Sequence, residues 1–170
     1  LIENVKVAPS PDAGAAAGRL RLTGFSLFNN IVDITNFILA EFGQPLHTFD
    51  ADRLSGPIHV RCARAGEKIL ALDGKTYALD GDLVIADDLR PAAIAGVIGG
   101  AETAVSDSTK KIVLECAWFE PAAIRRTSRK LGITTESSFR FERHVDPAGL
   151  ERSFFRAVDL IEKCSGGKLA

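Results

Sequence analysis

Between Pro57 and Asp87 the chain repeats short stretches in which apolar and polar residues alternate with a period of two. The stretches read IHVRCAR, KILAL, KTYALD and DLVIAD, and the turn dipeptides Asp73-Gly74 and Asp80-Gly81 fall between successive stretches. Alternation of this kind predicts half-buried β-strands, and Asp-Gly is a strong signal for a tight hairpin turn. Because hairpins join antiparallel neighbours, this block favours an antiparallel sheet over parallel strand–helix–strand units.

Helix signals lie on both sides of this block. Helices are predicted from residues 10–24, 29–43 and 121–132 and from residue 146 onward. Ser10-Pro11-Asp12 starts the first helix, Asn29 or Asn30 caps the second, and glycines end the first three. The last helix places on one face Leu150, Phe154, Ala157, Val158 and Ile161. AAIAGVIGG and KKIVLECAWF predict two further strands. We therefore predict an α+β fold, a mainly antiparallel or mixed β-sheet core with flanking helices, in a single domain over residues 1–170.

Composition excludes some classes of function. The 21 basic and 22 acidic residues give a net charge of −1, so any nucleic-acid surface must be a local patch. No apolar run is long enough to cross a bilayer. Cys62, Cys116 and Cys164 form no CxxC pair, and we expect reduced core cysteines in a cytoplasmic protein. Because the chain begins at Leu1 and contains no methionine, we expect a piece of a longer protein.

Glu115 is the residue least suited to its surroundings. It lies between Leu114 and Cys116 in a stretch that otherwise resembles a core strand, and burial of an unpaired carboxylate is costly. Two interpretations stay open. Strand alternation turns Glu115 to the solvent together with Val113 and Ala117, or a buried Glu115 has a functional role.

Two other segments allow both a structural and a functional interpretation. The glycines of AGVIGG (Gly96, Gly99 and Gly100) either admit a ligand close to the backbone or form a bulge or tight strand exit. The hydroxyls of TTESSFRFER either line a polar pocket or satisfy turn and cap donors, and they belong to Thr134, Thr135, Ser137 and Ser138. No nucleophile elbow surrounds either serine.

Basic residues gather between residues 125 and 143. Six of them stand against Glu136 and Glu142, which gives six minus two, or +4; they are Arg125, Arg126, Arg129, Lys130, Arg140 and Arg143. A phosphate backbone suits this excess, and a solvated helix face is the alternative. Phe139 and Phe141 flank Arg140, and we interpret them as core positions of a strand rather than a base-stacking platform.

The three histidines give no metal site. His47, in GQPLHTFD, follows a predicted helix and is either a ligand contact or a turn residue. His59 falls in a predicted strand, and His144 is expected at the surface. None has the spacing to other ligands that a metal site needs, so no metal is predicted.

Several motifs together resemble one family. NNIVDITNFILAEFGQPLHTFDADRL and IAGVIGGAETAVSDSTKKIVLECAWFEPAAIRRTSRKLGITTESSFRFERHVDP resemble, in order, the B3/B4 editing domain of the β subunit of bacterial phenylalanyl-tRNA synthetase. The resemblance covers about Asn29 to Pro147. It implies an α+β domain that hydrolyses tyrosine wrongly esterified to tRNA(Phe).

The resemblance also assigns roles to residues. Glu115 matches the position that receives the tyrosine hydroxyl, and His47 matches the histidine of the same site. The other matched pocket positions are Asn36, on the preceding helix, Gly96 and Gly99, at the backbone beside the ligand, and Thr135 and Ser137, in the pocket wall. The chain departs from the family at two positions. Relatives often carry alanine at the position of Ser137, and they usually carry glycine at that of His144.

The partners and cofactors implied by the resemblance belong largely to a parent enzyme. The domain itself needs no cofactor, whereas the parent binds ATP and Mg²⁺ on its α subunit, where aminoacylation occurs. The implied partners are the acceptor end of tRNA(Phe) with its misacylated tyrosine and the α subunit in an (αβ)₂ heterotetramer, without a membrane. Weak tRNA contacts are expected at Arg125, Arg126, Arg129 and Arg140.

No residues form a nucleophile–base pair. We hypothesise that water attacks the aminoacyl ester, oriented by pocket donors and by the terminal ribose hydroxyl of the tRNA, with His47 as a positioning group. Two alternatives remain: a non-catalytic scaffold or tRNA-contact module of the synthetase, and a free-standing deacylase.

Overall fold

The chain divides into two structural units and crosses between them four times. The first unit comprises residues 1–52, 105–117 and 146–170, and the second comprises residues 53–104 and 118–145. The computed structural model describes residues 1–10 and 15–170, with the side chains of the first helix from Ala17 onward. Both units combine helices with antiparallel strands, which confirms the α+β prediction. The single-domain boundary of 1–170 stays a prediction.

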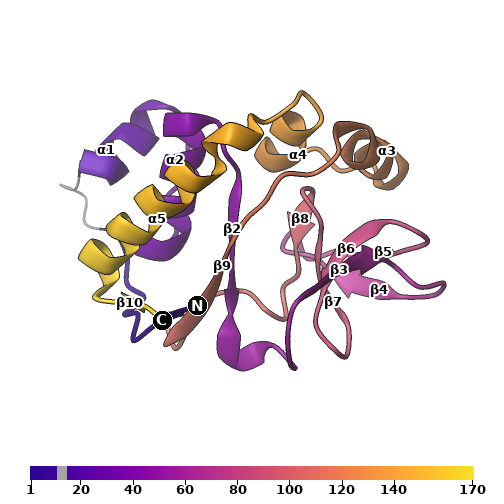
Figure 1. Cartoon of the computed structure of the whole chain (residues 1–170), viewed down its shortest axis with the longest axis horizontal. Helices are drawn as coiled ribbons and strands as arrows, with labels where there is room; N and C mark the ends of the chain where they lie inside the picture. Colours follow the sequence, from indigo (N-terminus) through magenta and orange to yellow (C-terminus); the bar gives the residue numbers. More distant parts are fainter. Residues whose placement is uncertain (11–14) are drawn as a thin grey trace. The chain divides into compact units, whose positions relative to one another are not determined.

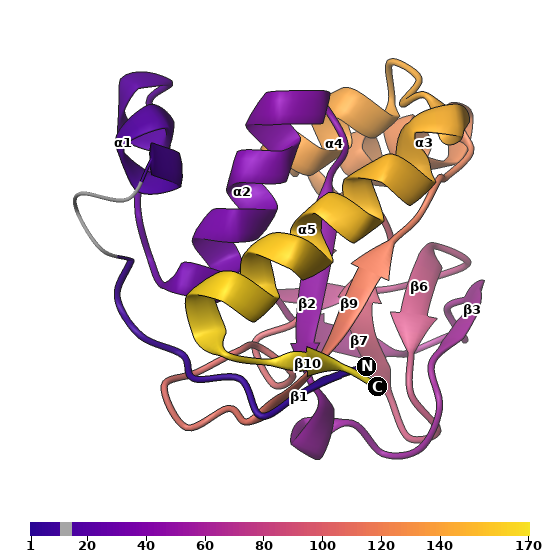
Figure 2. The same ribbon diagram turned by 60° about the vertical axis from the view of Figure 1, so that its left-hand side comes forward.

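The first unit is built on a four-stranded antiparallel sheet with the order β10-β1-β9-β2. Its strands are β1 (Ile2–Glu3), β2 (Leu46–Asp50), β9 (Lys111–Cys116) and β10 (Lys168–Leu169). Its helices are α1 (Ala15–Leu22), α2 (Asn30–Phe42) and α5 (Leu150–Ser165), with the short 3-10 helix η2 (Pro147–Gly149). A second 3-10 helix, η1 (Ala51–Arg53), includes the point where the chain passes to the second unit. In Figures 1 and 2, α2 and α5 lie side by side against this sheet, and the two termini meet where β1 pairs with β10.

The core of the first unit fixes which way each β9 side chain points. Ile112 of β9 is fully buried in a cluster with residues of α2 and α5, and Leu114 packs against the same cluster. The members from the two helices are Ile31, Ile34, Val158 and Ile161. Because successive strand residues point to opposite faces, Val113 and Glu115 lie on the face turned away from the helices.

The predicted limits of α2 are confirmed. The Asn29 side chain accepts hydrogen bonds from the backbone N–H groups of Ile31, at 3.1 Å, and Val32, at 2.9 Å. Gly43 ends the helix in the left-handed conformation, with φ 72°. The predicted start of the first helix at Pro11-Asp12 lies outside the described residues, but α1 and the positive φ of Gly24 are present as expected.

The second unit contains a four-stranded sheet with the order β3-β6-β7-β8 and a separate hairpin of β4 and β5. The strands are β3 (His59–Cys62), β4 (Lys68–Leu70), β5 (Thr76–Ala78), β6 (Leu83–Ala86), β7 (Pro91–Ile94) and β8 (Ile98–Gly99). The helices are α3 (Pro121–Leu131) and α4 (Glu136–Phe141). Gly74 and Gly81 have φ values of 79° and 69°, as the Asp-Gly turns predict. Asp73-Gly74 closes the hairpin of β4 and β5, whereas Asp80-Gly81 closes none, because β6 pairs with β3 and β7.

Two predicted strands were wrong. AAIAGVIGG is a hairpin of β7 and β8 rather than one strand, because Gly96 takes φ 66° and lets the chain reverse. Phe139 and Phe141 lie in helix α4 and not in a strand. Thr135 caps this helix by accepting from the Ser138 N–H at 3.0 Å, while the Ser138 hydroxyl accepts from the Thr135 N–H at 2.9 Å. This reciprocal capping box gives the segment a helical start that apolar spacing did not reveal.

The cysteine prediction is partly wrong. All three cysteines are free, but Cys62 and Cys164 are exposed and only Cys116 is half-buried. Cys62 lies on β3, the edge strand of its sheet, where fewer neighbours cover side chains. Within the described part of the chain, no helix combines the length and apolar character required to span a membrane.

His144 has a backbone conformation that favours glycine. It is exposed, with φ 68°, in the left-handed region that costs a side chain roughly 1–2 kcal/mol. We expect His144→Gly to raise the free energy of unfolding by about 0.5–1 kcal/mol, since the added flexibility of glycine in the unfolded chain offsets part of the gain.

Urea denaturation measures this gain, with His144→Ala as the control. Alanine keeps the Cβ atom and therefore the strain. If His144→Ala stabilised the chain as much as His144→Gly, loss of the imidazole would be the cause instead.

Candidate functional site

His47 and Glu115 are directly opposite each other in the antiparallel ladder of β2 and β9. Side chains at directly opposed positions have Cβ atoms roughly 5 Å apart, so the imidazole and the carboxyl are immediate neighbours. They lie on the sheet face opposite to Ile112 and Leu114, and therefore opposite to α2 and α5. The structure thus brings together the two residues to which the resemblance gives the central roles.

The carboxyl of Glu115 is unusual in having no internal partner. Burial raises its pKa from 4.5 to about 7, and no hydrogen bond to it occurs among the described residues. The strand alternation expected for Glu115 and Val113 is present, and both residues are half-buried on that face, so Glu115 is neither a core residue nor a fully solvated one. A group with this pKa is present in both protonation states near neutral pH.

His47 is half-buried, and the Nε2 atom of its imidazole is fully buried. Its Nε2 atom makes no hydrogen bond among the described residues, and burial lowers its pKa from 6.5 to about 4. The ring packs edge-on against fully buried Phe49, with centroids 4.6 Å apart and an interplanar angle of 83°. His47 is therefore neutral at pH 7. With so low a pKa it is a weak general base, which fits a positioning group better than a proton acceptor.

Cys116, next to Glu115, is unsuited to nucleophilic attack. Burial and the negative charge of Glu115 raise the pKa of its thiol to about 11. Its Sγ donates to the Leu150 carbonyl at 3.4 Å. The thiolate is the nucleophilic form, so this cysteine stays unreactive near neutral pH.

Gln44 holds the end of the same ladder and is a residue of this site that the sequence motifs do not indicate. Its side-chain amide donates to the carbonyls of Pro45, at 2.9 Å, and Ala117, at 3.0 Å. These bonds join the start of β2 to the exit of β9, immediately beside the His47–Glu115 pair. The residue is only 2% exposed, and its Oε1 has no partner among the described residues. A glutamine between the helix-ending glycine and a proline was the available signal.

Asn36 belongs to the first unit but is not joined to the pair. It lies on α2 and is half-buried, and no hydrogen bond to its side chain occurs in the described part of the chain. Its amide is therefore not committed to the fold.

The remaining predicted pocket residues lie in the second unit. The Thr135 hydroxyl donates to the Val97 carbonyl at 2.7 Å, which joins the start of α4 to the turn at Gly96. Gly99 lies in β8, where its carbonyl accepts from the Leu72 N–H at 3.0 Å. Ser137, in the first turn of α4, is half-buried and makes no hydrogen bond among the described residues. A common substrate pocket for the residues of both units stays a prediction.

The basic residues differ in how they are held. Arg125 Nη2 donates to the Glu142 carbonyl at 2.7 Å, and Arg140 pairs with Glu136 at 2.5 Å. Arg126 and Arg129 are exposed on α3 and have no ion pair among the described residues. The Arg126–Arg129 face of α3 is therefore open to an anionic partner.

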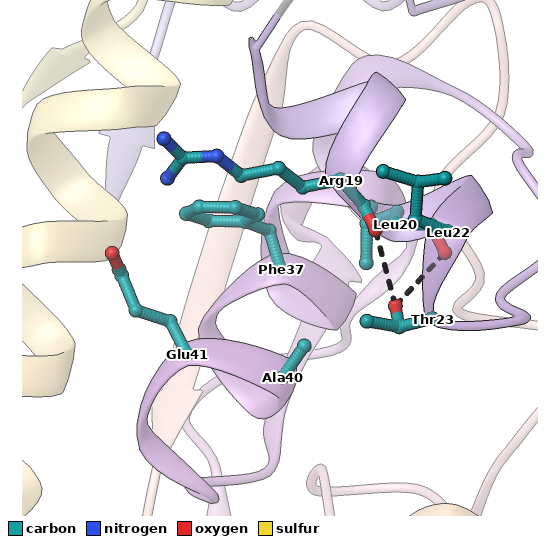
Figure 3. Close-up of a pocket in the computed structure, with 7 residues that line it drawn as sticks. All are labelled: Arg19, Leu20, Leu22, Thr23, Phe37, Ala40 and Glu41. Carbon is teal, nitrogen blue, oxygen red and sulfur yellow. Dashed lines mark hydrogen bonds between the residues drawn. The ribbon is translucent and has the colours of Figure 1, made fainter.

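A cavity of about 330 Å³ lies elsewhere in the first unit, between α1 and α2. Figure 3 shows the Arg19 side chain running along the ring of Phe37, with Thr23 bonded back to α1. The Thr23 hydroxyl donates to the Leu20 carbonyl at 2.9 Å, and Glu41 pairs with Arg156 at 3.4 Å, so these polar groups serve the fold. None of the predicted site residues lines this cavity, whose lining is Arg19, Leu20, Leu22, Thr23, Phe37, Ala40 and Glu41.

The described residues contain no group of three or more histidine, cysteine, aspartate or glutamate side chains placed to hold a metal ion.

The chain is similar to known proteins over nearly its whole length. Residues 1–166 match the sequence profile described as "B3/4 domain". The chain is 50% identical to the phenylalanine–tRNA ligase β subunit of Carboxydothermus hydrogenoformans. This match extends over 171 residues and covers 99% of the chain. It is 49% identical to the β subunits of Fusobacterium nucleatum, over 98% of this chain, and Aquifex aeolicus, over 99%. It spans only about a fifth of the length of these relatives, 21%, 21% and 22% respectively.

Proposed function

Because the chain belongs to the B3/4 domain family, we propose that it is the editing part of a phenylalanine–tRNA ligase β subunit. In this proposal it hydrolyses tyrosine wrongly attached to tRNA(Phe). The partners are the acceptor end of that tRNA and the α subunit of an (αβ)₂ enzyme, where ATP and Mg²⁺ serve aminoacylation. The editing step itself uses no cofactor.

One observation supports this function above the others: Glu115 is half-buried, its carboxyl has no hydrogen-bond partner among the described residues, and burial raises its pKa to about 7. A synthesis pocket built for phenylalanine rejects tyrosine only about a hundredfold, because one added hydroxyl is a weak handle for exclusion. A second pocket that requires the hydroxyl has the opposite selectivity, because it accepts tyrosine and rejects phenylalanine. Tyrosine would satisfy Glu115 with a hydrogen bond, whereas phenylalanine would leave a buried polar group unpaired.

His47 supports the same scheme as a positioning group. It is neutral at pH 7, and its unpartnered Nε2 offers one hydrogen bond to the substrate or to the attacking water. The water adds to the ester carbonyl, and the ester C–O bond to the ribose then breaks, which releases tyrosine and the free 3′ end. The ribose hydroxyl of the tRNA orients the water, because the described residues offer no nucleophile–base pair for this task.

Deacylation of tyrosyl-tRNA(Phe) by the complete synthetase tests the proposal. We expect Glu115→Ala to lower kcat/KM roughly tenfold to a hundredfold, because the phenolic hydroxyl loses its partner in a buried site. Glu151→Gln, an exposed acidic position on α5, is the control and keeps the wild-type rate. An unchanged rate in Glu115→Ala would remove Glu115 from substrate recognition.

His47→Ala separates positioning from chemistry. If it abolished hydrolysis while the affinity for tyrosine stayed constant, His47 would act chemically and its positioning role would be wrong.

The alternative, a non-catalytic scaffold or tRNA-contact module, predicts a different binding result. An editing pocket binds free tyrosine in preference to phenylalanine, and Glu115→Ala removes the preference. A scaffold binds neither amino acid, so calorimetric titration of the synthetase with both amino acids distinguishes the two functions. An α-subunit variant unable to bind phenylalanine removes the contribution of the synthesis site.

A further inference from the structure

The two phenylalanines of α4 have opposite environments. Phe141 is 2% exposed and packs edge-on against Phe119, with ring centroids 5.0 Å apart. Phe139 is 47% exposed. Residues two apart on a helix point in nearly opposite directions, so only one of the pair can reach the core. The expectation that both are core residues is therefore wrong for Phe139, and its exposure needs another explanation.

The ring of Phe139 is held in place by an arginine. The Arg143 guanidinium lies 3.7 Å from the ring centroid, and its Nη1 donates to the Phe139 carbonyl at 2.9 Å. The same nitrogen contacts the Glu142 carboxylate. A ring that is capped by a bonded guanidinium is a prearranged surface, and it loses little side-chain freedom when a ligand binds.

A second arginine, Arg125 of α3, reaches the C-terminal end of α4, close to Arg143. Arg125 donates to the Glu142 carbonyl at 2.7 Å, and Glu142 also binds Arg143. Two guanidinium groups therefore converge on one glutamate at the C-terminal end of α4, which leaves a local excess of positive charge beside the exposed ring. A flat aromatic surface next to arginines fits a nucleotide, since the base stacks on the ring and the guanidinium groups attract phosphate.

The position of Phe139 on α4 relates this surface to the pocket wall. Thr135 and Phe139 are four residues apart, roughly 6 Å along the helix. Thr135 and Ser137 are the wall residues in the proposed editing function, so a base on Phe139 would lie about one helical turn from the place where the amino acid is held.

We propose that Phe139, Arg143 and Arg125 form a stacking platform for an unpaired base at the 3′ end of the aminoacylated tRNA. This inference rests on the proposed editing function and adds to it the residues that hold the RNA end. The platform binds the nucleotide and takes no part in hydrolysis. It therefore acts on substrate binding, and its loss raises KM and leaves kcat nearly unchanged.

Uncharged tRNA(Phe) carrying 2-aminopurine at each unpaired 3′ position in turn tests the platform directly. Stacking quenches the fluorescence of this base. With the complete synthetase we expect quenching at one position, retained in Phe139→Tyr and lost in Phe139→Ala and Phe139→Leu at saturating enzyme. Phe155→Ala, another exposed phenylalanine, on α5 and 53% exposed, is the matched control and keeps the quenching. Equal quenching in the wild type and Phe139→Leu would overturn the proposal.

Deacylation kinetics provide the second measurement. We expect Phe139→Leu to raise KM for tyrosyl-tRNA(Phe) between about fivefold and a hundredfold, the range measured for removal of one base-stacking aromatic. Arg143→Gln raises KM as well, and the increase grows with falling salt concentration. Unchanged KM values in both variants would exclude the platform. Failure of the proposed editing function would give a different result from failure of the platform. The wild-type enzyme would then not hydrolyse the ester, but its binding would still quench the 2-aminopurine fluorescence.

Discussion

Replacing His47 by glutamine is expected to make the stability of the chain fall by about 3 kcal/mol as the pH rises from 4.5 to 7. In this variant Glu115 titrates alone. The native state holds the Glu115 proton up to pH about 7, whereas the unfolded chain releases it near 4.5. Between these values the native state binds more protons, so each step up in pH favours unfolding.

Replacing Glu115 by glutamine is expected to give the opposite slope. The unfolded chain protonates His47 below pH 6.5, and the native state does so only near pH 4. Within this window the unfolded state binds more protons. Stability therefore rises by about 3 kcal/mol from pH 4 to 6.5 and is lost again as the pH falls.

In the wild type the two slopes oppose each other between pH 4.5 and 6.5, so this pair leaves stability nearly independent of pH there. Urea denaturation at several pH values, with the double variant as reference, measures each slope by difference, because all other titrating groups are shared. Parallel profiles for the two single variants would show that burial does not shift these two groups.

Replacing Gly96 by alanine is expected to destabilise the chain by roughly 2–5 kcal/mol. The φ of 66° costs any side chain roughly 1–2 kcal/mol. In addition, an added Cβ would lie 2.9 Å from Ile124 Cδ1, 3.0 Å from Phe119 Cδ2 and 3.1 Å from Phe141 Cδ2. Relief of such overpacking in a core costs about 1–3 kcal/mol more.

Gly81→Ala separates these two contributions. Gly81 has a nearly identical φ of 69°, but among the described residues, apart from its chain neighbours, no atom lies within 4 Å of the position that its Cβ would take. Chemical denaturation of both variants is expected to show the larger loss for Gly96→Ala, and the difference measures the packing cost. Equal losses would mean that the side chains around Gly96 move aside freely.

For Gly96 the sequence alone leaves two explanations open: a tight turn or bulge of the backbone, or a ligand bound close to the backbone. The structure provides a complete structural explanation, because the left-handed turn and three close core side chains each require glycine. A ligand beside its backbone is an additional proposal that the fold does not need.

For Glu115 the fold gives no structural explanation of the kind found for Gly96. The sequence shows that Glu115 lies in an apolar strand. It does not show where the side chain points, because alternation alone does not say which face of a sheet is covered. The fold turns Ile112 to the helices, which sends Glu115 to the other face, and there burial raises its pKa to about 7. No hydrogen bond to the Glu115 carboxyl occurs among the described residues.

The sequence by itself determined the local elements: the capped helix α2, the hairpin at Asp73-Gly74, the turn at Asp80-Gly81 and the strand that carries Glu115. These follow from turn chemistry, caps and apolar periodicity, which act between residues close in the chain. Only the tertiary structure decided the register that sets His47 opposite Glu115, the exposure of Phe139 and the burial of Phe141. These depend on contacts between distant segments, and the preferences of neighbouring residues carry no information about which distant surface will cover them.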